Sequence, residues 1–186
     1  MPGYQPVVVV MSVVLGLTIT QLLKGIAQLY RARARVRTYW IHWGWVGLLL
    51  VFSLLLWWTF WNYREISEWS FFRFVLYLSP VVTLFYLTAI VIPDPSDTVT
   101  SLKEYYFTNR VALFGTFALC GVLAGVTAAL VRGLPWSDPS HLLRLALVLL
   151  MLIAMRSANE RVHAVILFLS AGMMLLFIFL YHFRLN

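Results

Sequence analysis

Charged residues are scarce in this sequence. They make up 11% of its 186 residues, whereas hydrophobic residues make up 62%. Soluble domains carry about 25% charged residues, so too few are present here to coat a water-soluble globule. The same composition excludes an intrinsically disordered chain, which needs low hydrophobicity and high charge. We therefore predict an integral membrane protein.

Carboxylates are absent from the interior of every apolar run. All seven acids fall in predicted loops or at predicted helix ends: Glu65, Glu68, Asp94, Asp97, Glu104, Asp138 and Glu160. Proton and cation pumps usually place carboxylates near the middle of the membrane, where a buried acid exchanges a proton or holds an ion. A carboxylate-driven antiporter is therefore disfavoured.

Cysteine is nearly absent as well. The single Cys120 lies inside an apolar run, which excludes an intrachain disulfide and a CxxC redox or zinc site. The sequence also lacks HExxH, GxGxxG and GxSxG motifs. We predict no catalytic residue, no metal and no cofactor. Enzymatic activity is left open, but a non-enzymatic role is favoured.

Long apolar runs, in contrast, fill the chain. A transmembrane helix needs roughly 20 apolar residues, and aromatic residues, which make up 16% of the chain, gather at run ends as in membrane-interface belts. We predict an all-α polytopic bundle forming one transmembrane domain over residues 1–186. Its six transmembrane helices are expected at about 7–29, 40–61, 71–92, 111–131, 141–157 and 162–181.

The fifth run is short. Between Arg144 and Arg156 lie eleven uncharged residues, or about 16 Å of helix against a hydrocarbon core about 30 Å thick. A full span requires both arginines to extend to the interface or to turn toward the protein. A re-entrant hairpin with the sixth run is the alternative.

Basic residues predict the orientation. The net charge of +7 lies in short loops, where topology and anionic lipid headgroups explain it better than nucleic acid does. The loop between the first two runs carries Arg31, Arg33, Arg35 and Arg37, so we place it in the cytoplasm. Both termini then lie outside.

The longest connection is predicted to form a short interfacial helix on the cytoplasmic face, over Thr98–Asn109. Helix-capping residues precede it: Asp94, Ser96 and Asp97. Three further side chains are expected to lie on the headgroup layer: Leu102, Tyr105 and Tyr106. A plain loop is the alternative.

Four segments together resemble an uncharacterised family of small bacterial six-helix inner-membrane proteins. The segments read GLTITQLLKGIAQLYRARAR (16–35), YWIHWGW (39–45), WWTFWNYREISEW (57–69) and SLKEYYFTNR (101–110). The resemblance covers roughly the first 110 residues and implies a bacterial inner membrane and six helices. It implies no activity and no functional residue.

A polar stripe lies within the first predicted helix. At about 100° per residue, five residues share one face of its cytoplasmic half: Thr20, Gln21, Lys24, Gln28 and Arg31. The stripe predicts a water-filled, cationic vestibule that attracts anions or anionic headgroups. The alternative is a helix–helix contact, with Lys24 extending to the cytoplasm.

Histidines suggest a second hypothesis. His42 and His163 are expected near the cytoplasmic face, and His141 and His182 near the outer face, as in a bundle that holds two b-haems. However, His163 and His182 are nineteen residues apart, about 28 Å along one helix, which puts both in the headgroup zone. Interfacial histidines without metal are therefore favoured.

Small residues repeat every fourth position at Gly121, Gly125 and Ala129. This period lets helix backbones approach closely. It predicts either a seam between copies in a homo-oligomer or packing within the monomer.

Polar residues crowd the turn before the last run: Arg156, Asn159, Glu160, Arg161 and His163. Arg156 and Glu160 lie one helical turn apart in the sequence and can pair. The cluster is predicted to cap a tight cytoplasmic turn, and a ligand or gating role is the alternative.

Three functions remain. The leading one is a small channel or transport-type protein that uses the first-helix stripe as its polar path. The second is a membrane-embedded structural or signalling subunit that acts with a partner protein, and the third is a b-haem electron-transfer protein. The expected partners are lipids with anionic headgroups, further copies of the chain, or another protein.

Overall fold

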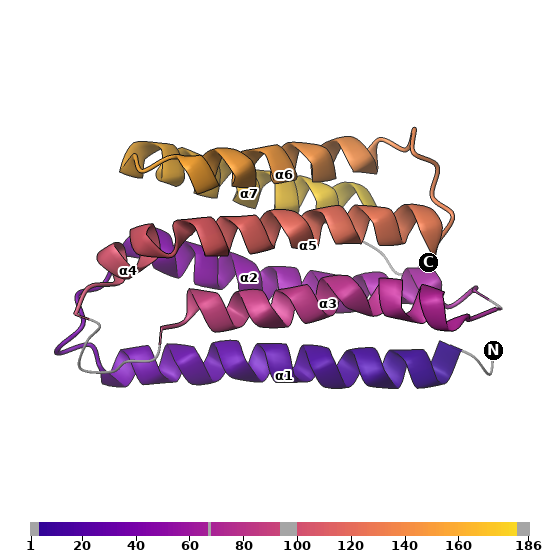
Figure 1. Ribbon diagram of the computed structural model, residues 1–186, viewed down its shortest axis with the longest axis horizontal. Helices are drawn as coiled ribbons and strands as arrows, with labels where there is room; N and C mark the ends of the chain where they lie inside the picture. Colours follow the sequence, from indigo (N-terminus) through magenta and orange to yellow (C-terminus); the bar gives the residue numbers. More distant parts are fainter. Residues whose placement is uncertain (1–3, 67, 94–99, 182–186) are drawn as a thin grey trace.

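The computed structural model describes residues 4–66, 68–93 and 100–181. Helices run back and forth along the long axis of the molecule (Figure 1), which confirms the all-α prediction. They are α1 (Tyr4–Arg31), α2 (Trp40–Thr59) continued by the 3-10 helix η1 (Phe60–Tyr63), α3 (Phe71–Val91), α4 (Leu102–Thr108), α5 (Arg110–Leu130), α6 (Ser140–Arg156) and α7 (Glu160–Tyr181).

Five helical segments are long and apolar enough to cross a membrane: α1, α2 with η1, α3, α5 and α7. The corresponding runs predicted from the sequence begin and end within three residues of these helices. The shorter α6 has 17 residues, which span about 25 Å. It is a continuous helix that runs alongside α5 (Figure 1).

Five helices form a ring. Around it, α2 contacts α3, α3 packs on α5, α5 on α6, α6 on α7, and α7 returns to α2. The remaining long helix, α1, packs against α3 and α2 from outside this ring. The first helix is therefore peripheral, and the interior of the ring belongs to the other five.

The contact between α3 and α5 is built around Pro80. Proline has no N–H, so the carbonyl of Leu76 one turn earlier loses its usual helical donor. Thr127 of α5 donates its hydroxyl to that carbonyl at 2.9 Å, and the Ser79 hydroxyl donates at 2.7 Å. The Cys120 thiol donates to the Pro80 carbonyl at 3.3 Å. Side chains thus replace the missing bond where a membrane offers no water.

Small residues let α5 and α6 approach closely. A Cβ added at Gly121 would lie 2.9 Å from Cγ2 of Val148, and one added at Gly125 would lie 3.9 Å from Cδ of Arg144. The face predicted as an oligomer seam is therefore covered by α6 at both glycines, and Ala129 one turn further on is half-buried. The structure thus shows the packing within the monomer, and a seam between copies stays a prediction.

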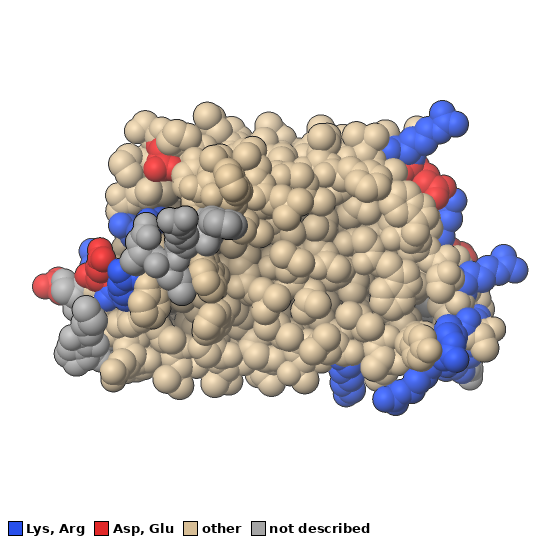
Figure 2. All heavy atoms as spheres, turned by 180° about the vertical axis from the view of Figure 1, so that it is seen from behind, with Lys and Arg blue, Asp and Glu red and all other residues tan. Residues whose placement is uncertain are grey.

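The two ends of the bundle differ in their connections (Figure 1). At the α4 end lie α4, the loop from α1 to α2 and the turn from α6 to α7; at the η1 end lie η1 and the loop from α5 to α6. Backbone bonds join two loops at the α4 end, because Arg37 N–H donates to Thr100 O at 2.9 Å and Leu102 N–H to Arg37 O at 3.0 Å. On the face shown in Figure 2, charged side chains gather at both ends and the middle is uncharged.

Candidate functional site

A cavity of about 130 Å³ lies inside the five-helix ring and extends toward the η1 end. Its walls are mainly apolar, with Phe52 from α2, Phe117 from α5, Leu147 from α6 and Met173 from α7 among them. A cavity of about 150 Å³ in another protein binds benzene. The interior of this ring is therefore large enough for one aromatic ring or a short alkyl chain.

Two guanidinium groups lie at the η1 end of the cavity. Arg144 of α6 donates to Ser140 Oγ at 2.7 Å, and its Cζ lies 5.2 Å from the centre of the Phe177 ring. Arg132 follows α5 just before Gly133, whose left-handed backbone (φ 75°) ends the helix. Within the described residues, neither arginine forms an ion pair with a carboxylate. This end of the cavity is therefore suited to an anion.

Hydroxyl groups line the cavity wall without partners. Tyr77 of α3 is 2% exposed and Ser170 of α7 is 3% exposed, and both border the cavity. Neither hydroxyl has a hydrogen-bond partner among the described residues. A buried polar group left unpaired costs about 1–3 kcal/mol. A bound molecule with a polar group at this depth would recover part of that cost.

At the α4 end the ring interior is closed by Tyr106 of α4 and His163 of α7. The Tyr106 hydroxyl lies 2.8 Å from His163 Nδ1, and His163 Nε2 lies 2.9 Å from the Ser157 carbonyl. A carbonyl only accepts, so Nε2 carries the proton and Nδ1 accepts from Tyr106. Both side chains are almost fully buried. The α4 end is thus closed by a hydrogen-bonded pair from two helices.

Aromatic rings connect this closure to the cavity. The Phe114 ring centre lies 5.8 Å from that of Tyr106 and 5.1 Å from that of Trp45. Trp45 in turn borders the cavity from α2. The closure and the inner wall of the cavity therefore belong to one packed cluster.

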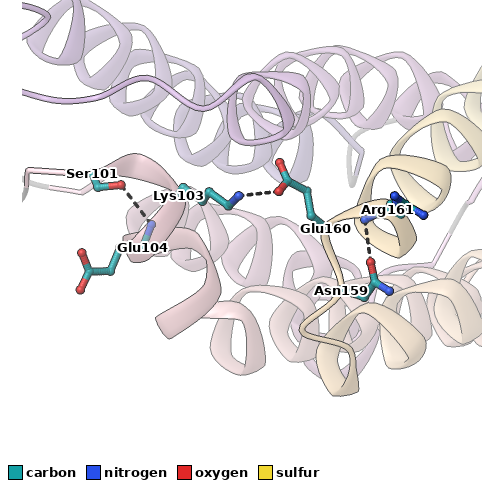
Figure 3. Close-up of polar contacts among 6 residues, drawn as sticks. All are labelled: Ser101, Lys103, Glu104, Asn159, Glu160 and Arg161. Atoms are coloured by element: carbon teal, nitrogen blue, oxygen red, sulfur yellow. Dashed lines mark hydrogen bonds and ion pairs between the residues drawn. The ribbon is translucent and has the colours of Figure 1, made fainter.

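Charged residues form the outer layer of the closure, shown in Figure 3. Lys103 of α4 pairs with Glu160 at the start of α7. Among the described residues Glu160 therefore pairs with Lys103 of α4, and no ion pair joins it to Arg156, which the sequence offered as its possible partner. Burial raises the pKa of the Tyr39 hydroxyl above its ordinary value, and the negative charge of Glu160 raises this pKa further.

The other members of the predicted turn cluster have local roles. Asn159 Oδ1 accepts from the Arg161 N–H at 2.9 Å (Figure 3), and the Ser157 hydroxyl accepts from the Asn159 N–H at 3.1 Å. Arg156 is exposed at the end of α6. The structure brings His163 and Glu160 to α4, whereas the rest of the cluster caps the turn.

The predicted interfacial helix is shorter and more deeply packed than expected. Of the predicted range Thr98–Asn109, α4 occupies Leu102–Thr108 and is capped by the Ser101 hydroxyl, which accepts from the Glu104 N–H (Figure 3). Leu102 and Tyr106 are each 1% exposed, so they face the bundle and not a headgroup layer. The predicted caps lie outside the described residues: Asp94, Ser96 and Asp97.

The hydrogen bonds of the histidines disfavour the alternative hypothesis of haem pairs. Both ring nitrogens of His163 are hydrogen-bonded, so neither is left to bind iron. His42 is 1% exposed, neither of its nitrogens has a hydrogen-bond partner among the described residues, and its ring centre lies 6.2 Å from that of Tyr106. His141 packs on Trp136 at 5.4 Å, and His182 lies outside the described residues. In the described part of the chain, no three His, Cys, Asp or Glu residues are placed to hold a metal ion.

The polar stripe of α1 lies on the peripheral helix. Lys24 is exposed, as are Thr20 and Arg31, whereas Gln21 and Gln28 are half-buried. None of these five residues borders the central cavity. Gln28 and Arg31 instead line a separate hollow at the α4 end. A path along the stripe stays a prediction, and the stripe is not continuous with the cavity.

Sequence reasoning missed the cavity, Tyr77 and Ser170, and it treated Arg144 only as an obstacle to spanning. The sequence signal that could have indicated the cavity was Arg144, a charged residue inside a short apolar run. Comparison of the chain with protein-family models, curated proteins and solved structures gives no match. The proposed function therefore rests on this geometry alone.

Proposed function

We propose that the chain is a non-enzymatic, transport-type protein of the bacterial inner membrane, with the interior of the five-helix ring as its solute path. The observation that carries the proposal is the cavity, which extends toward the η1 end and is closed at the α4 end by Tyr106 and His163. A cavity that is closed toward one face of a helical bundle is what alternating access requires of a carrier at one step of its cycle. The α1 stripe is not required for this path.

In this proposal α6 is the sixth span. Its length of about 25 Å is close to the hydrocarbon thickness of about 30 Å. The difficulty that Arg144 posed is relieved because its guanidinium turns toward the protein, where it meets Ser140 and Phe177. Arg156 is exposed at the opposite end of the helix, within reach of headgroups.

We orient the α4 end toward the cytoplasm. Eight basic residues belong to this end: Arg31, Arg33, Arg35, Arg37, Lys103, Arg110, Arg156 and Arg161. Four in the described residues belong to the other end: Arg64, Arg73, Arg132 and Arg144. An excess of Lys and Arg marks cytoplasmic loops, so the cavity faces outward and both termini lie outside.

Cysteine accessibility tests the path. In a Cys120→Ala background, Ala124→Cys places a thiol on the cavity wall, and Val122→Cys places one on the exposed face of the same helix at nearly the same depth. In intact cells a membrane-impermeant maleimide is expected to label position 124 from outside and to leave position 122 unlabelled. Equal labelling of the two positions, or none at 124, would overturn the proposed path.

Flux tests the transport role. Benzenesulfonate stays ionised at neutral pH, has a benzene-sized body and is a suitable solute for proteoliposomes. We expect the protein to raise its uptake, and we expect Ala124→Trp, which fills the cavity, to lower uptake at least tenfold. Val122→Trp on the exposed face is the matched control. Uptake equal to that of protein-free liposomes would contradict the transport proposal.

A further inference from the structure

We infer that the cavity binds a small amphiphilic anion: an anionic group held by Arg132 and Arg144, and an apolar body of ring size whose polar group meets Tyr77 and Ser170. This inference names the solute class of the proposed path and rests on that proposal. The cavity supplies three separate arguments for it, from charge, from size and from unpaired hydroxyls.

The charge of the two arginines favours an anion as the solute. Arg132 and Arg144 line the η1 end of the cavity, and the nearest acid in sequence, Asp138, lies near enough for its charge to act on Arg144 but forms no ion pair with it among the described residues. Asp138 Oδ1 accepts from the Ser140 N–H at 2.8 Å, and these bonds to Ser140 hold the pKa of Asp138 below its ordinary value. Arg144 donates to Ser140 and has no ion-pair partner among the described residues, so a bound sulfonate, carboxylate or phosphate can accept a charge-assisted hydrogen bond from it.

The volume of the cavity favours a small solute. A volume of about 130 Å³ is close to that of a cavity that binds benzene. The two acyl chains of a phospholipid are many times larger. An anionic headgroup from the bilayer and a free organic anion offer the same charge to the arginines, and the volume favours the free anion.

The two hydroxyls without partners favour a solute whose apolar body carries a polar group. Tyr77 of α3 and Ser170 of α7 line a cavity that is otherwise mainly apolar, and neither hydroxyl has a hydrogen-bond partner among the described residues. A hydroxyl both donates and accepts, so a carbonyl or hydroxyl on the solute can pair with either. The apolar body is therefore expected to carry one such group, not to be a plain hydrocarbon.

Calorimetric titration of the purified full chain in detergent tests the inference. The probes are benzenesulfonate, 4-acetylbenzenesulfonate with its extra carbonyl, benzylammonium with the opposite charge, and dioleoylphosphatidylglycerol. We expect both sulfonates to bind and the acetyl compound to bind more tightly. Binding of benzylammonium with equal affinity would overturn the anion assignment, and displacement of the sulfonate by the phospholipid would overturn the small-solute assignment.

Variants locate the binding groups. Arg144→Gln is expected to weaken sulfonate binding at least tenfold, and Arg144→Lys, which keeps the charge, at most about threefold. Arg73→Gln removes an exposed charge at the same end and is the matched control. Unchanged affinity in a folded Arg144→Gln variant, as judged by its thermal melting, would overturn the inference. Should Arg144→Gln not fold, Arg132→Gln decides, with a weakening of at least threefold expected.

Two further variants test the hydroxyl contacts. Tyr77→Phe and Ser170→Ala are expected to lower the affinity for the acetyl compound more than the affinity for benzenesulfonate, and so to remove the preference for the acetyl compound. An unaltered preference in both would overturn this part of the inference. Binding that depends on Arg144 without any flux would contradict the transport proposal alone, whereas flux without such binding would contradict the solute assignment alone.

Discussion

The two ends of the ring satisfy their polar groups in opposite ways. At the α4 end, Tyr106 bonds to His163 and Lys103 pairs with Glu160, so side chains from different helices complete one another. Toward the η1 end, Tyr77, Ser170 and two arginines line a cavity, and the two hydroxyls have no hydrogen-bond partner among the described residues. The first arrangement favours a closed bundle, whereas the second favours a bound molecule. His42 is an exception, because it is unpaired although it lies at the α4 end.

The largest difference is expected from truncating one aromatic residue at each end. Tyr106→Ala removes a fully buried ring and should cost about 3–5 kcal/mol of stability. Phe177→Ala removes a half-buried ring that already borders the cavity, so its cost should be less than half as large. Thermal melting of both variants in one detergent measures the difference. Equal losses would show that the two ends are packed equally well.

Removing one hydroxyl at each end gives the next largest difference. Tyr106→Phe leaves His163 Nδ1 buried without its donor, which should cost about 1–3 kcal/mol. Tyr77→Phe removes a hydroxyl that has no partner in the part of the chain that the structure describes, so stability in the absence of ligand should be unchanged or slightly higher. The same substitution is thus expected to lower the melting temperature at one end only. A fall of similar size for Tyr77→Phe would reveal a partner for its hydroxyl.

The ion pair over the closure should have the smallest effect. The side chains of Lys103 and Glu160 are 52% and 43% exposed, and pairs of this kind contribute about 0.2–1 kcal/mol. Lys103→Glu should therefore destabilise the protein slightly and raise benzenesulfonate flux by loosening α4. Combining it with Glu160→Lys should restore both values, and high salt should weaken the effect. If the double variant does not restore flux, then the attachment of α4 does not control the passage of the solute.

The helices were predictable because their signals are local. Hydrophobic runs and their flanking arginines and tryptophans define where each span begins and ends, and no long-range contact is needed for that. For this reason the predicted run 71–92 matches α3 (Phe71–Val91) closely. The seven-residue α4 was harder to predict, because its position depends on a hydrogen bond from Tyr106 to His163, 57 residues away.

The cavity was not predictable from the same signals. It depends on which faces of five helices meet, and the sequence does not give the order of helices around the ring. The stripe on α1 was expected to face water inside the protein, but α1 packs outside the ring and Lys24 is exposed. A flexible four-carbon side chain tolerates such a site by reaching toward the interface, so one lysine in a span is weak evidence for a path.

The backbone bridge between Arg37 and Ser101 determines how substitutions can affect the α4 end. Both of its hydrogen bonds use main-chain atoms: the N–H and C=O of Arg37, the carbonyl of Thr100 and the N–H of Leu102. Almost any side chain is therefore compatible with the bridge, and proline at 37 or 102 is the exception because it has no N–H to donate. The charge of the basic loop can thus vary in evolution, or be redesigned for membranes of different lipid charge, while α4 keeps its attachment.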